Sequence, residues 1–584
     1  MRNLNHILRT ALLLVLLGTF IDANAFYFTV DGIRYCTLED YNHVAYDDGG
    51  NLEFDGILFE DGVWVVRGEN AYSGEVVIPE TVTYNNKTYR VTGILSAFSY
   101  CRELTSVTLP NTVTFISGKA FEFCQNLSKV VLSQSLRHID SGAFVKCESL
   151  KTIDLPESLR TINFGAFYAS GLKSISIPDS VHVKSEAFYQ SSIESVSVSS
   201  HAMLMGDHIF DETPWMSNQP SDEVIYIGTH LYCYNGILPS GSAVTVKEGT
   251  TGIAGGAFAP HLDNLEDNSW INQGINKVDI PNSVTYIGEE AFKGTQLIKA
   301  NIPSSVENIG QDAFAECTNL ISANVPSAVK HLKDGTFRDC AFLRSITLEE
   351  GLESIGYEAF YGDVRLNDFV IPKSVKLIDC GAFENCSALR EITINAETIE
   401  NNAFRNCTSL TKVTIGDSNI VIGEYAFHNS GIKEISIGKN SKYIGVIAFY
   451  GNSGASKVTC FASTPPVIFT GSGSDIDVTN DMGWGPYTFH DDTYTQATLF
   501  VPEGSEEAYM IANPWKYFAY IKGITLDVGP SDVNGDGEVN IADINSVLNA
   551  IINDSYDERL DVNGDGEINI ADINEVVQTI LETN

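Results

Sequence analysis

"LIKANIPSSVENIGQDAFAEC", residues 297 to 317, contains one structural unit of this chain. It begins with the pattern Leu-x-x-apolar-x-apolar, whose last three positions alternate inward and outward, as a half-buried strand requires. Pro303 follows at once and marks the end of the strand, because proline cannot donate a hydrogen bond to a neighbouring strand. Val306 and Ile309 supply a second short strand, and Phe314 fills the middle of the coil.

The same unit recurs along most of the chain. "CTNLISANVPSAVKHLKDGTFRD" and "CTSLTKVTIGDSNIVIGEYAFHN" repeat its order of apolar residues and turns. Within each of two blocks, the anchor phenylalanines are 21 to 23 residues apart, a fixed period that indicates a solenoid. They are Phe98, Phe121, Phe144, Phe167 and Phe188, and then Phe292, Phe314, Phe337, Phe360, Phe383, Phe404, Phe427 and Phe449.

One coil cannot bury its own apolar face, so the coils must stack. The sequence therefore predicts a mainly β solenoid, a rod of about fifteen coils of about 23 residues, each adding roughly 4.8 Å. The unit resembles the coil of BspA-like bacterial leucine-rich-repeat surface proteins, L-x-x-I-x-I-P-x-S-V-x-x-I-G-x-x-A-F-x-x-C, from which residues 297 to 317 differ only at Ala300. This resemblance covers about residues 26 to 525 and implies the fold, whereas binding in such families lies in variable exposed positions.

A small residue stands three positions after most anchors. It is Cys101, Cys124, Cys147, Cys317, Cys340, Cys386 or Cys407, and elsewhere Ser170, Ser191, Thr295 or Ser430. Exchange among Cys, Ser and Thr indicates a side chain that bonds to the backbone of a turn, so we expect buried free thiols. Disulfides between coils are the alternative, because the coil spacing lies within disulfide range. Cys36, Cys233, Cys380 and Cys460 lie outside this position, and the pattern assigns them no role.

The ends of the chain and one interval depart from the repeat. Residues 1–25 have a short basic start, an apolar run from Ala11 to Ile21 and small residues at 23–25, which is typical of a secretory signal peptide. A membrane anchor is the alternative, but the run is shorter than a bilayer span, and no later stretch is apolar enough to cross. We predict an N-terminal β cap at 26–93, leucine-rich repeats at 94–205 and 275–457, a β insertion at 206–274, a C-terminal cap at 458–528 and a calcium-binding module at 529–584.

Aromatic residues gather in the predicted insertion. They are Trp215, Tyr226, Tyr232, Tyr234 and Trp270. Packing of the insertion onto the rod is one interpretation, and a ligand platform is the other. The segment "EVIYIGTHLYCYNGILPSGSAVTVKEG" is typical of a strand pair, with a turn near "NGIL".

The tail contains "DVNGDGEVNIAD" and, 29 residues later, "DVNGDGEINIAD". The spacing of oxygen-bearing residues, with glycine at the sixth position, is that of the calcium loop of an EF-hand. We therefore expect two Ca²⁺ ions. The predicted ligands are Asp532, Asn534, Asp536, Glu538, Asn540 and Asp543 in the first loop and Asp561, Asn563, Asp565, Glu567, Asn569 and Asp572 in the second.

Two features separate the tail from an EF-hand. The twelfth loop position is Asp instead of Glu, and only one helix, after each loop, accompanies it. A calcium loop followed by a single helix, present twice, resembles a type I dockerin, which implies docking onto a cohesin. The pairs Ile541-Ala542 and Ile570-Ala571 stand where clostridial dockerins often carry Ser-Thr. The partner could therefore be another surface protein, or this chain's own rod.

Charge and motifs exclude several functions. The chain has 36 basic and 75 acidic residues, a net charge of −39, which argues against binding to nucleic acid or an anionic membrane. We find no motif of a metalloprotease, a serine hydrolase or a phosphate-binding loop. His201 and His208 lack further ligands that would complete a metal site, so we predict no enzymatic activity.

The leading functional hypothesis is a secreted or cell-surface binding protein. Its candidate face is the outward position between the two apolar residues of the first strand, where a ladder of short oxygen-bearing side chains would suit a glycan or a host matrix protein. A solvated sheet face would look the same. The alternative function is a non-catalytic accessory subunit of a polysaccharide-degrading assembly, recruited through the dockerin. The ladder consists of Thr108, Asp154, Ser176, Asp279, Asn301, Asn324, Thr347, Thr393, Thr414 and Ser436.

Overall fold

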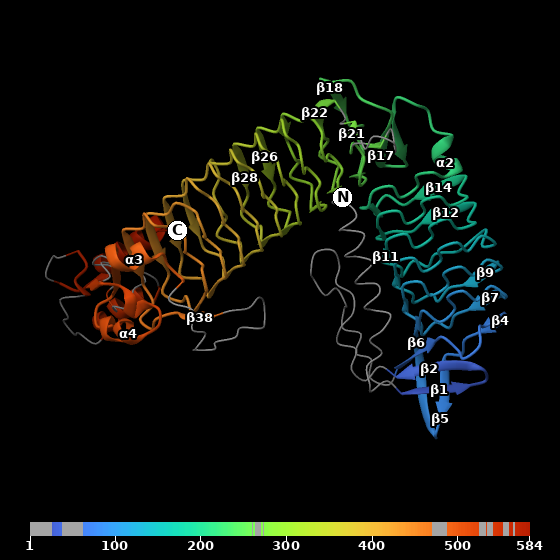
Figure 1. Ribbon diagram of the computed structural model, residues 1–584, viewed down its shortest axis with the longest axis horizontal. Coiled ribbons are helices and arrows are strands. Elements are labelled where there is room, and N and C mark those ends of the chain that lie inside the picture. The colour runs from blue at the N-terminus through green and yellow to red at the C-terminus, as the bar shows by residue number, and fades with distance from the viewer. Residues whose placement is uncertain are drawn as a thin grey trace.

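The computed structural model describes residues 26–37, 62–259, 261–262, 270–271, 274–469, 487–524, 533, 541–552, 560–563 and 567–583. The predicted signal peptide lies outside these residues. The described chain is a mainly β solenoid bent into an arch, with an N-terminal arm (residues 94–211) and a C-terminal arm (residues 240–469) (Figure 1). No helix within the described part has the length and apolar character needed to cross a membrane.

Most coils contribute a first strand to the outer side of the arch, where neighbouring first strands pair in parallel within several short sheets (Figure 1). On the N-terminal side these are β4 (Gly74–Val77), which precedes the arm, and β7 (Leu104–Thr108), β9 (Lys129–Val131), β12 (Ser174–Ile177) and β14 (Ser195–Val198) within it. In the C-terminal arm they are β18 (Ser242–Thr245), β22 (Ile275–Asp279), β24 (Lys299–Ala300), β26 (Ser322–Val325), β28 (Ser345–Leu348), β31 (Glu391–Ile394), β33 (Lys412–Ile415), β35 (Glu434–Ile437) and β37 (Lys457–Cys460). Apolar and polar residues alternate in them, as the sequence predicts.

The second strands are shorter and form the inner side of the arch. They are β8 (Phe115–Ile116), β10 (His138–Ile139), β11 (Thr161–Ile162), β13 (His182–Val183) and β15 (Met203–Leu204) in the N-terminal arm. In the C-terminal arm they are β19 (Gly252–Ile253), β23 (Tyr286–Ile287), β25 (Asn308–Ile309), β27 (His331–Leu332), β29 (Ser354–Ile355), β30 (Leu377–Ile378), β32 (Thr398–Ile399), β34 (Val421–Ile422), β36 (Tyr443–Gly445) and β38 (Val467–Phe469).

The anchor phenylalanines form two stacks along the arms. Neighbouring rings are nearly parallel, with centroids 4.9 Å apart for Phe98 and Phe121 and 5.6 Å apart for Phe337 and Phe360. All anchors are fully buried. The apolar side chains separate into two cores, one for each arm, so the bend divides the hydrophobic interior.

The bend contains both a hairpin and a coil. Helix α2 (Pro214–Ser217) leads into β16 (Glu223–Ile227) and β17 (His230–Asn235), which pair antiparallel across a turn at residues 228–229 and not at "NGIL". A complete coil then follows at 240–259, within the interval predicted as an insertion, because β18 pairs with β22 and β19 pairs with β23. Its anchor Phe258 stacks on Phe292 at 5.3 Å. The anchor spacing of 21 to 23 residues does not predict Phe258, because this residue lies 48 residues after Phe210 and 34 before Phe292.

Strand β17 separates the two cores. Leu231 and Tyr234 pack in the C-terminal core, whereas Tyr232 and Cys233 pack in the N-terminal core. Trp215 packs edge-on against Tyr232 and Phe210, with centroids 5.5 and 5.6 Å away. These contacts support the packing interpretation of these aromatic residues.

The two arms also bond to each other directly. Tyr286 of the C-terminal arm accepts a hydrogen bond from the backbone N–H of Leu204 at 2.8 Å, and its hydroxyl lies 3.1 Å from Nδ1 of His230. Nε2 of His230 lies 2.8 Å from the carbonyl oxygen of Ser199. Burial lowers the pKa of His230, so the ring is neutral and bridges hairpin and arms.

Caps cover both ends of the solenoid. At the N-terminal end, β1 (Tyr27–Val30), β2 (Ile33–Thr37), β3 (Gly62–Val66), β5 (Thr81–Tyr84) and β6 (Lys87–Leu95) extend the inner sheet. The C-terminal end contains α3 (Asp491–Gln496), β39 (Thr498–Pro502), α4 (Glu506–Ile511), η1 (Trp515–Tyr517) and β40 (Tyr520–Ile524). Trp515 and Phe518 pack there against Phe489, which stacks on the last anchor. A short pair, β20 (His261–Leu262) with β21 (Trp270–Ile271), belongs to the bend.

Candidate functional site

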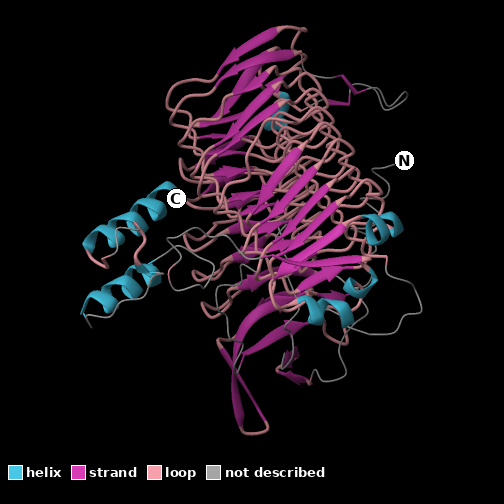
Figure 2. Cartoon of the chain, turned by 90° about the vertical axis from the view of Figure 1, so that its left-hand side faces the viewer, coloured by secondary structure: helices cyan, strands magenta, loops and turns pink. Residues whose placement is uncertain are grey.

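The tail is a pair of equivalent helices, α5 (Ile541–Ile552) and α6 (Ile570–Thr583) (Figure 2). Each presents one apolar stripe to the other, with residues at the spacing that places them on one helix face. The same positions of the two copies meet in this core, since residue 572 corresponds to 543. The core consists of Val533, Ile544, Val547, Ile551, Leu560, Val562, Ile568, Ile573, Val576 and Ile580.

The twelfth loop residues, Asp543 and Asp572, are both completely buried in the first turn of their helices. One carboxylate oxygen of Asp572 accepts a hydrogen bond from the backbone N–H of Asn563 at 3.2 Å, and the other accepts one from Asn569 at 2.8 Å. The carboxylate therefore lies across the loop from its third position. The helix N-terminus also favours a negative charge at this place.

The other described residues of the second loop fit an oxygen-rich cation site. Asp561 is half-buried, and Asn563 and Glu567 are exposed. Asn569 uses its side-chain oxygen to accept a hydrogen bond from the backbone N–H of Ala571 at 2.8 Å, and so caps α6. Carboxylate and amide oxygens around a buried Asp are the donor set that Ca²⁺ prefers, and the ion would hold the loop against the helix.

Half of the predicted calcium ligands lie outside the described residues. They are Asp532, Asn534, Asp536, Glu538, Asn540 and Asp565. Within the described part, no three His, Cys, Asp or Glu side chains form a metal-binding group. The twelve-ligand assignment and the two ions therefore stay predictions. Residues 529–584 contain 13 Asp and Glu and a single basic residue, Arg559, so a bound cation would relieve strong repulsion.

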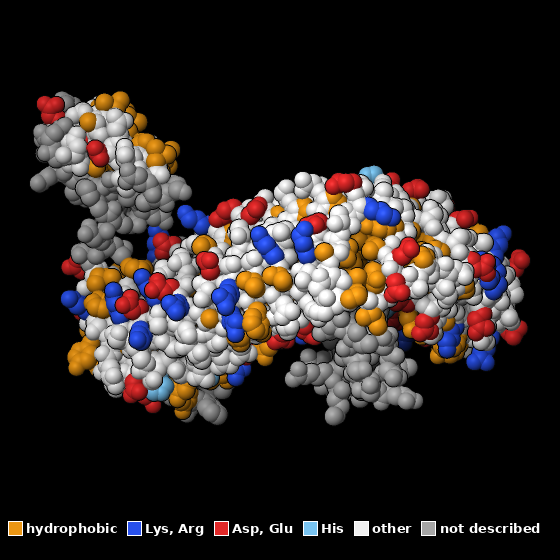
Figure 3. Space-filling model, turned by 90° about the horizontal axis from the view of Figure 1, so that it is seen from above, with side chains coloured by type: hydrophobic (Ala, Val, Ile, Leu, Met, Phe, Trp, Pro, Cys, Tyr) orange, Lys and Arg blue, Asp and Glu red, His pale blue; other side chains and the backbone are white. Residues whose placement is uncertain are grey.

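Apolar residues are also exposed on the tail, at equivalent positions of the two copies. Ile541 and Ile570 are each 71% exposed, and Ile552 and Leu581 are 69% and 72% exposed. Apolar side chains are visible on the surface of the tail in Figure 3. Exposed apolar side chains repeated in this way mark a surface for a protein partner.

The predicted outward ladder lies on the outer side of the arch. In-register parallel pairing places Thr393 beside Thr414 and Thr414 beside Ser436. The side chain of Asn324 binds the backbone of the preceding coil. Its amide group donates a hydrogen bond to the carbonyl of Ile302 at 2.8 Å and its amide oxygen accepts one from the N–H of Ile302 at 2.9 Å. The residues of the ladder are exposed or half-buried, as an outward face requires.

Most of the small residues after the anchors act as backbone hydrogen-bond donors, whereas among the described residues the hydroxyl groups of Ser170 and Ser191 are buried without a hydrogen-bond partner. Cys124 donates from Sγ to the carbonyl of Phe98, an anchor of the preceding coil, at 3.0 Å, and Ser430 donates to Phe404 at 2.6 Å. This contact explains the exchange among Cys, Ser and Thr. All eleven cysteines are free thiols, and Cys36, Cys233 and Cys460 are buried, whereas Cys380 is half-buried.

Two members of this series escaped the sequence analysis because they are neither Cys, Ser nor Thr. Asn452 accepts a hydrogen bond from the N–H of Ser430 at 3.1 Å and donates to the carbonyl of Phe427 at 2.8 Å. Asp363 accepts from the N–H of Cys340 at 2.7 Å and is completely buried. Burial raises the pKa of Asp363 well above its usual value and so favours the protonated carboxyl group.

A cavity of about 510 Å³ lies at the bend, lined by residues that include His208, Asp211, Glu212, Asp222 and Tyr232. Burial opposes protonation of His208, but the hydrogen bond to Asp211 and the charge of Asp207 raise its pKa to about 9. His201 bonds instead to Asp179, at 3.2 Å. The two histidines do not share a site.

Comparisons with known proteins agree with the two parts of the chain. The family model described as BspA type leucine rich repeat region matches residues 95–217, 263–390 and 381–465, in six copies. The model of the dockerin type I domain matches residues 530–581. No curated protein matches the chain.

Several solved structures are similar to the chain. A leucine-rich repeat protein from Bacteroides ovatus is 24% identical, and the match covers 74% of this chain and 94% of that one with a TM-score of 0.29. A leucine rich cell surface protein from Faecalibacterium prausnitzii is 20% identical, with coverages of 72% and 94% and a TM-score of 0.24. A leucine-rich repeat protein from Eubacterium ventriosum is 20% identical, with coverages of 70% and 95% and a TM-score of 0.29.

Proposed function

Because the chain belongs to the BspA type leucine-rich repeat family and ends in a type I dockerin domain, we propose that it is a secreted or cell-surface binding protein without catalytic activity. Its solenoid presents a ligand surface, and its tail docks the protein onto a partner in a calcium-dependent way. Both families are generally non-catalytic and typical of extracellular or surface proteins, which supports this assignment.

The repeated apolar surface of the tail carries the docking proposal. Ile541 and Ile552 on one helix and Ile570 and Leu581 on the other leave water only when a partner covers them. A type I dockerin implies a cohesin as that partner. Calcium would position the surface, because Ile541 and Ile570 begin the helices at the tenth position of each loop.

The solenoid would supply the adhesive part of the function. The outer ladder offers hydroxyl groups, such as those of Thr347, Thr393 and Thr414, at successive or nearby coils. Such a series suits hydrogen bonding to an extended ligand, either a glycan or a host matrix protein. The accessory-subunit alternative keeps the same docking, but places the protein beside enzymes on a common scaffold.

A binding assay with purified type I cohesins tests the docking proposal. Residues 26–584 should bind at least one cohesin in calcium, and should lose it in EGTA or when truncated to 26–525. The double variant Ile541→Asp, Ile570→Asp should bind at least roughly tenfold more weakly, because it places charges in the apolar contact. Glu575→Gln, at an exposed position of α6, serves as the control.

Three outcomes would count against docking through this surface. They are equal binding by the double variant, binding that persists in EGTA and binding by the truncated chain. Binding of the tail to residues 26–525 in place of any cohesin would assign the dockerin to this chain's own rod.

A further inference from the structure

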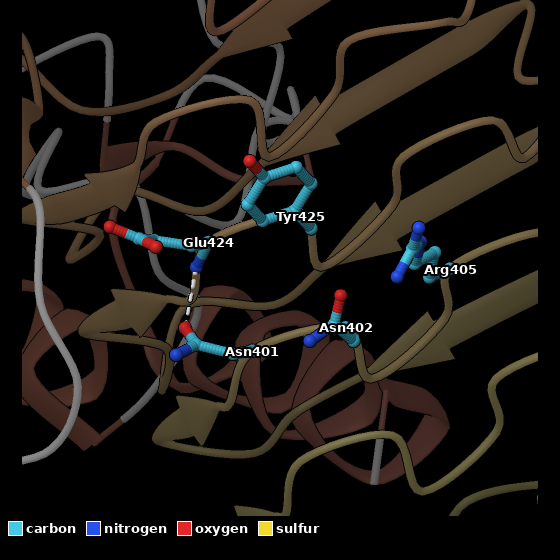
Figure 4. Close-up of a pocket in the computed structure, with 5 residues that line it drawn as sticks. All are labelled: Asn401, Asn402, Arg405, Glu424 and Tyr425. Carbon is cyan, nitrogen blue, oxygen red and sulfur yellow. Dashed lines mark hydrogen bonds between the residues drawn. The ribbon is translucent and has the colours of Figure 1, made fainter.

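A groove of about 380 Å³ lies on the C-terminal arm, on the turns that precede and follow the anchors Phe404 and Phe427. Five side chains line it, and Figure 4 shows them around a common space: Asn401, Asn402, Arg405, Glu424 and Tyr425. The amide oxygen of Asn401 accepts a hydrogen bond from the N–H of Glu424 at 2.7 Å, which fixes one wall. These turns follow the second strands, so the groove is separate from the outer ladder.

Polar atoms in and beside the groove are buried without a hydrogen-bonding partner. Among the described residues, Nε of Arg405 and Nδ1 of His428 are buried and have no hydrogen-bond partner. Buried polar atoms in folded proteins are nearly always satisfied, so each exception calls for an explanation. Hydroxyl groups of a bound ligand would satisfy these nitrogens once the two side chains turn toward the groove, because a hydroxyl both donates and accepts.

Aromatic rings continue the groove along the arm. His428 packs edge-on against Tyr425, with centroids 5.6 Å apart, and lies parallel to Tyr450 at 6.3 Å. Tyr450 in turn contacts His490 at 5.5 Å and Tyr487 at 6.0 Å. The rings thus extend over successive coils, which fits an extended chain better than a single small molecule. Aromatic faces bury the apolar C–H surface of a sugar ring, while the polar neighbours bind its hydroxyls.

The charges around the groove select against an anionic ligand. Arg405 is the one cation among the lining residues, and its guanidinium already lies 3.7 Å from the carboxylate of Glu384. Glu424 adds a second carboxylate. Burial, followed by the charge of Arg405, lowers the pKa of His428, so this ring is uncharged at neutral pH. The five lining residues therefore offer no excess positive charge to an anionic ligand.

We propose that this groove is a binding site for a neutral polysaccharide chain, with Tyr425 and Tyr450 stacking on sugar rings and Asn402 and Arg405 bonding to their hydroxyls. The proposal rests on the proposed binding function of the solenoid and gives it a place and a ligand class. It does not involve the tail, so sugar binding should be the same in calcium and in EGTA.

Affinity electrophoresis of residues 26–584 tests the proposal, with hydroxyethyl cellulose, galactomannan and arabinoxylan as neutral probes and polygalacturonate as the acidic one. At least one neutral polymer should retard the protein, and polygalacturonate should not. Tyr425→Asn removes the ring but keeps the backbone, because Tyr425 has a φ of 55° and Asn402 already takes a φ of 59° at the same position of the preceding coil. It should weaken binding about tenfold, and Arg405→Gln should weaken it severalfold.

The matched control is Tyr100→Asn, which changes an exposed tyrosine with a φ of 61° on the N-terminal arm and should leave binding unchanged. Thermal melting of each variant shows whether it is folded. Failure of every neutral polymer to bind, preference for polygalacturonate, or equal losses from Tyr100→Asn and Tyr425→Asn would overturn the proposal. None of these results would alter the calcium-dependent cohesin assay, which tests docking separately.

Discussion

The solenoid and the tail are both tandem repeats, but different forces hold them together. Each coil inside an arm has a neighbour on both sides, and its anchor ring is buried between two others, as Phe314 is between Phe292 and Phe337. The tail has only two copies, and the buried residues of its core cluster, within the part that the structure describes, are Val533, Val547 and Val576, with partly buried neighbours around them. The comparison shows that repetition stabilises a fold only when enough copies share a continuous core.

The tail must therefore draw stability from another source. Its 13 acidic residues against one arginine oppose folding, and Asp543 and Asp572 are fully buried. A bound calcium ion reverses this balance, because binding to the folded state adds directly to the free energy of folding. We expect no comparable dependence in the solenoid.

Removal of calcium should have the largest effect. It should unfold the tail and leave the solenoid folded. In residues 26–584, EGTA should remove the helical contribution of α5 and α6 while the β signal of the solenoid stays. Far-UV circular dichroism checks this result, with residues 26–525 as the control that should not respond. Equal helix content with and without calcium would show that the small apolar core suffices.

Loss of one anchor ring should have the next largest effect. Phe314→Ala leaves a cavity inside the stack and should lower the free energy of unfolding of the C-terminal arm by about 3–5 kcal/mol. Phe342→Ala is the matched control, because this ring is 44% exposed and its loss should cost less than about 1 kcal/mol. Denaturant unfolding of residues 26–525 compares them, and similar losses would contradict the role of the stack.

Asp363 tests the role of the buried position three residues after the anchors. Its pKa is raised by burial, so the unfolded chain ionises first and the free energy of unfolding falls as the pH rises above about 4. Asp363→Asn should abolish this loss and stabilise the protein at pH 7, by about 1.4 kcal/mol for each pKa unit of the shift. Asn452 shows that an amide fits the equivalent position.

The reverse change, Asn452→Asp, should destabilise the protein at pH 7 and less so at pH 4. Melting temperatures measured between pH 4 and 8 check both variants. A lower melting temperature for Asp363→Asn than for the wild type at pH 7 would show that the carboxyl group is stabilising in place.

The joint between the arms should respond to acid with a smaller effect. The pKa of His230 is lowered by burial, so its contribution to stability is complete above the unfolded value near 6.5 and is lost as the pH falls below it. His230→Gln keeps a donor and an acceptor but cannot titrate. The melting temperature of this variant should therefore change less than that of the wild type between pH 7.5 and 5. An identical change in both proteins would show that His230 is not the source of the acid sensitivity.

The cysteines that follow the anchors should be free thiols. Titration under denaturant and without reductant should find most of the seven cysteines after the anchors reactive, because Cys124 and its equivalents use their S–H groups as donors. Nearly complete oxidation would contradict the thiol assignment and favour disulfides between coils.

The sequence was sufficient for the coil and insufficient for the places where coils differ. The spacing of Leu297, Ile302, Val306 and Phe314 predicts both strands and the stack, because every neighbour repeats the same contact. The bend depends on contacts that occur once, such as those of Tyr286 with His230 and Leu204. The spacing of the repeat cannot predict contacts of this kind. Spacing also concealed the coil around Phe258.

The candidate sites show the same limit. The calcium loops could be found because the order of oxygen-bearing residues is written within twelve positions, and the structure places Asp572 across its loop as that order requires. The groove joins Arg405 and Tyr425 from successive coils, at positions that vary along the solenoid. These two residues lie together only because these particular coils are neighbours. The repeat pattern describes the positions that all coils share and gives no information about the positions that vary.

Calorimetric titration of calcium into residues 26–584 tests the central claim most directly. The account predicts uptake of two ions, none by residues 26–525, and loss of uptake when Asp532 and Asp561, the first ligands of the two loops, are both changed to Ala. Absence of calcium uptake by the wild-type chain at millimolar concentrations would contradict the metal assignment and, with it, the docking function of the tail.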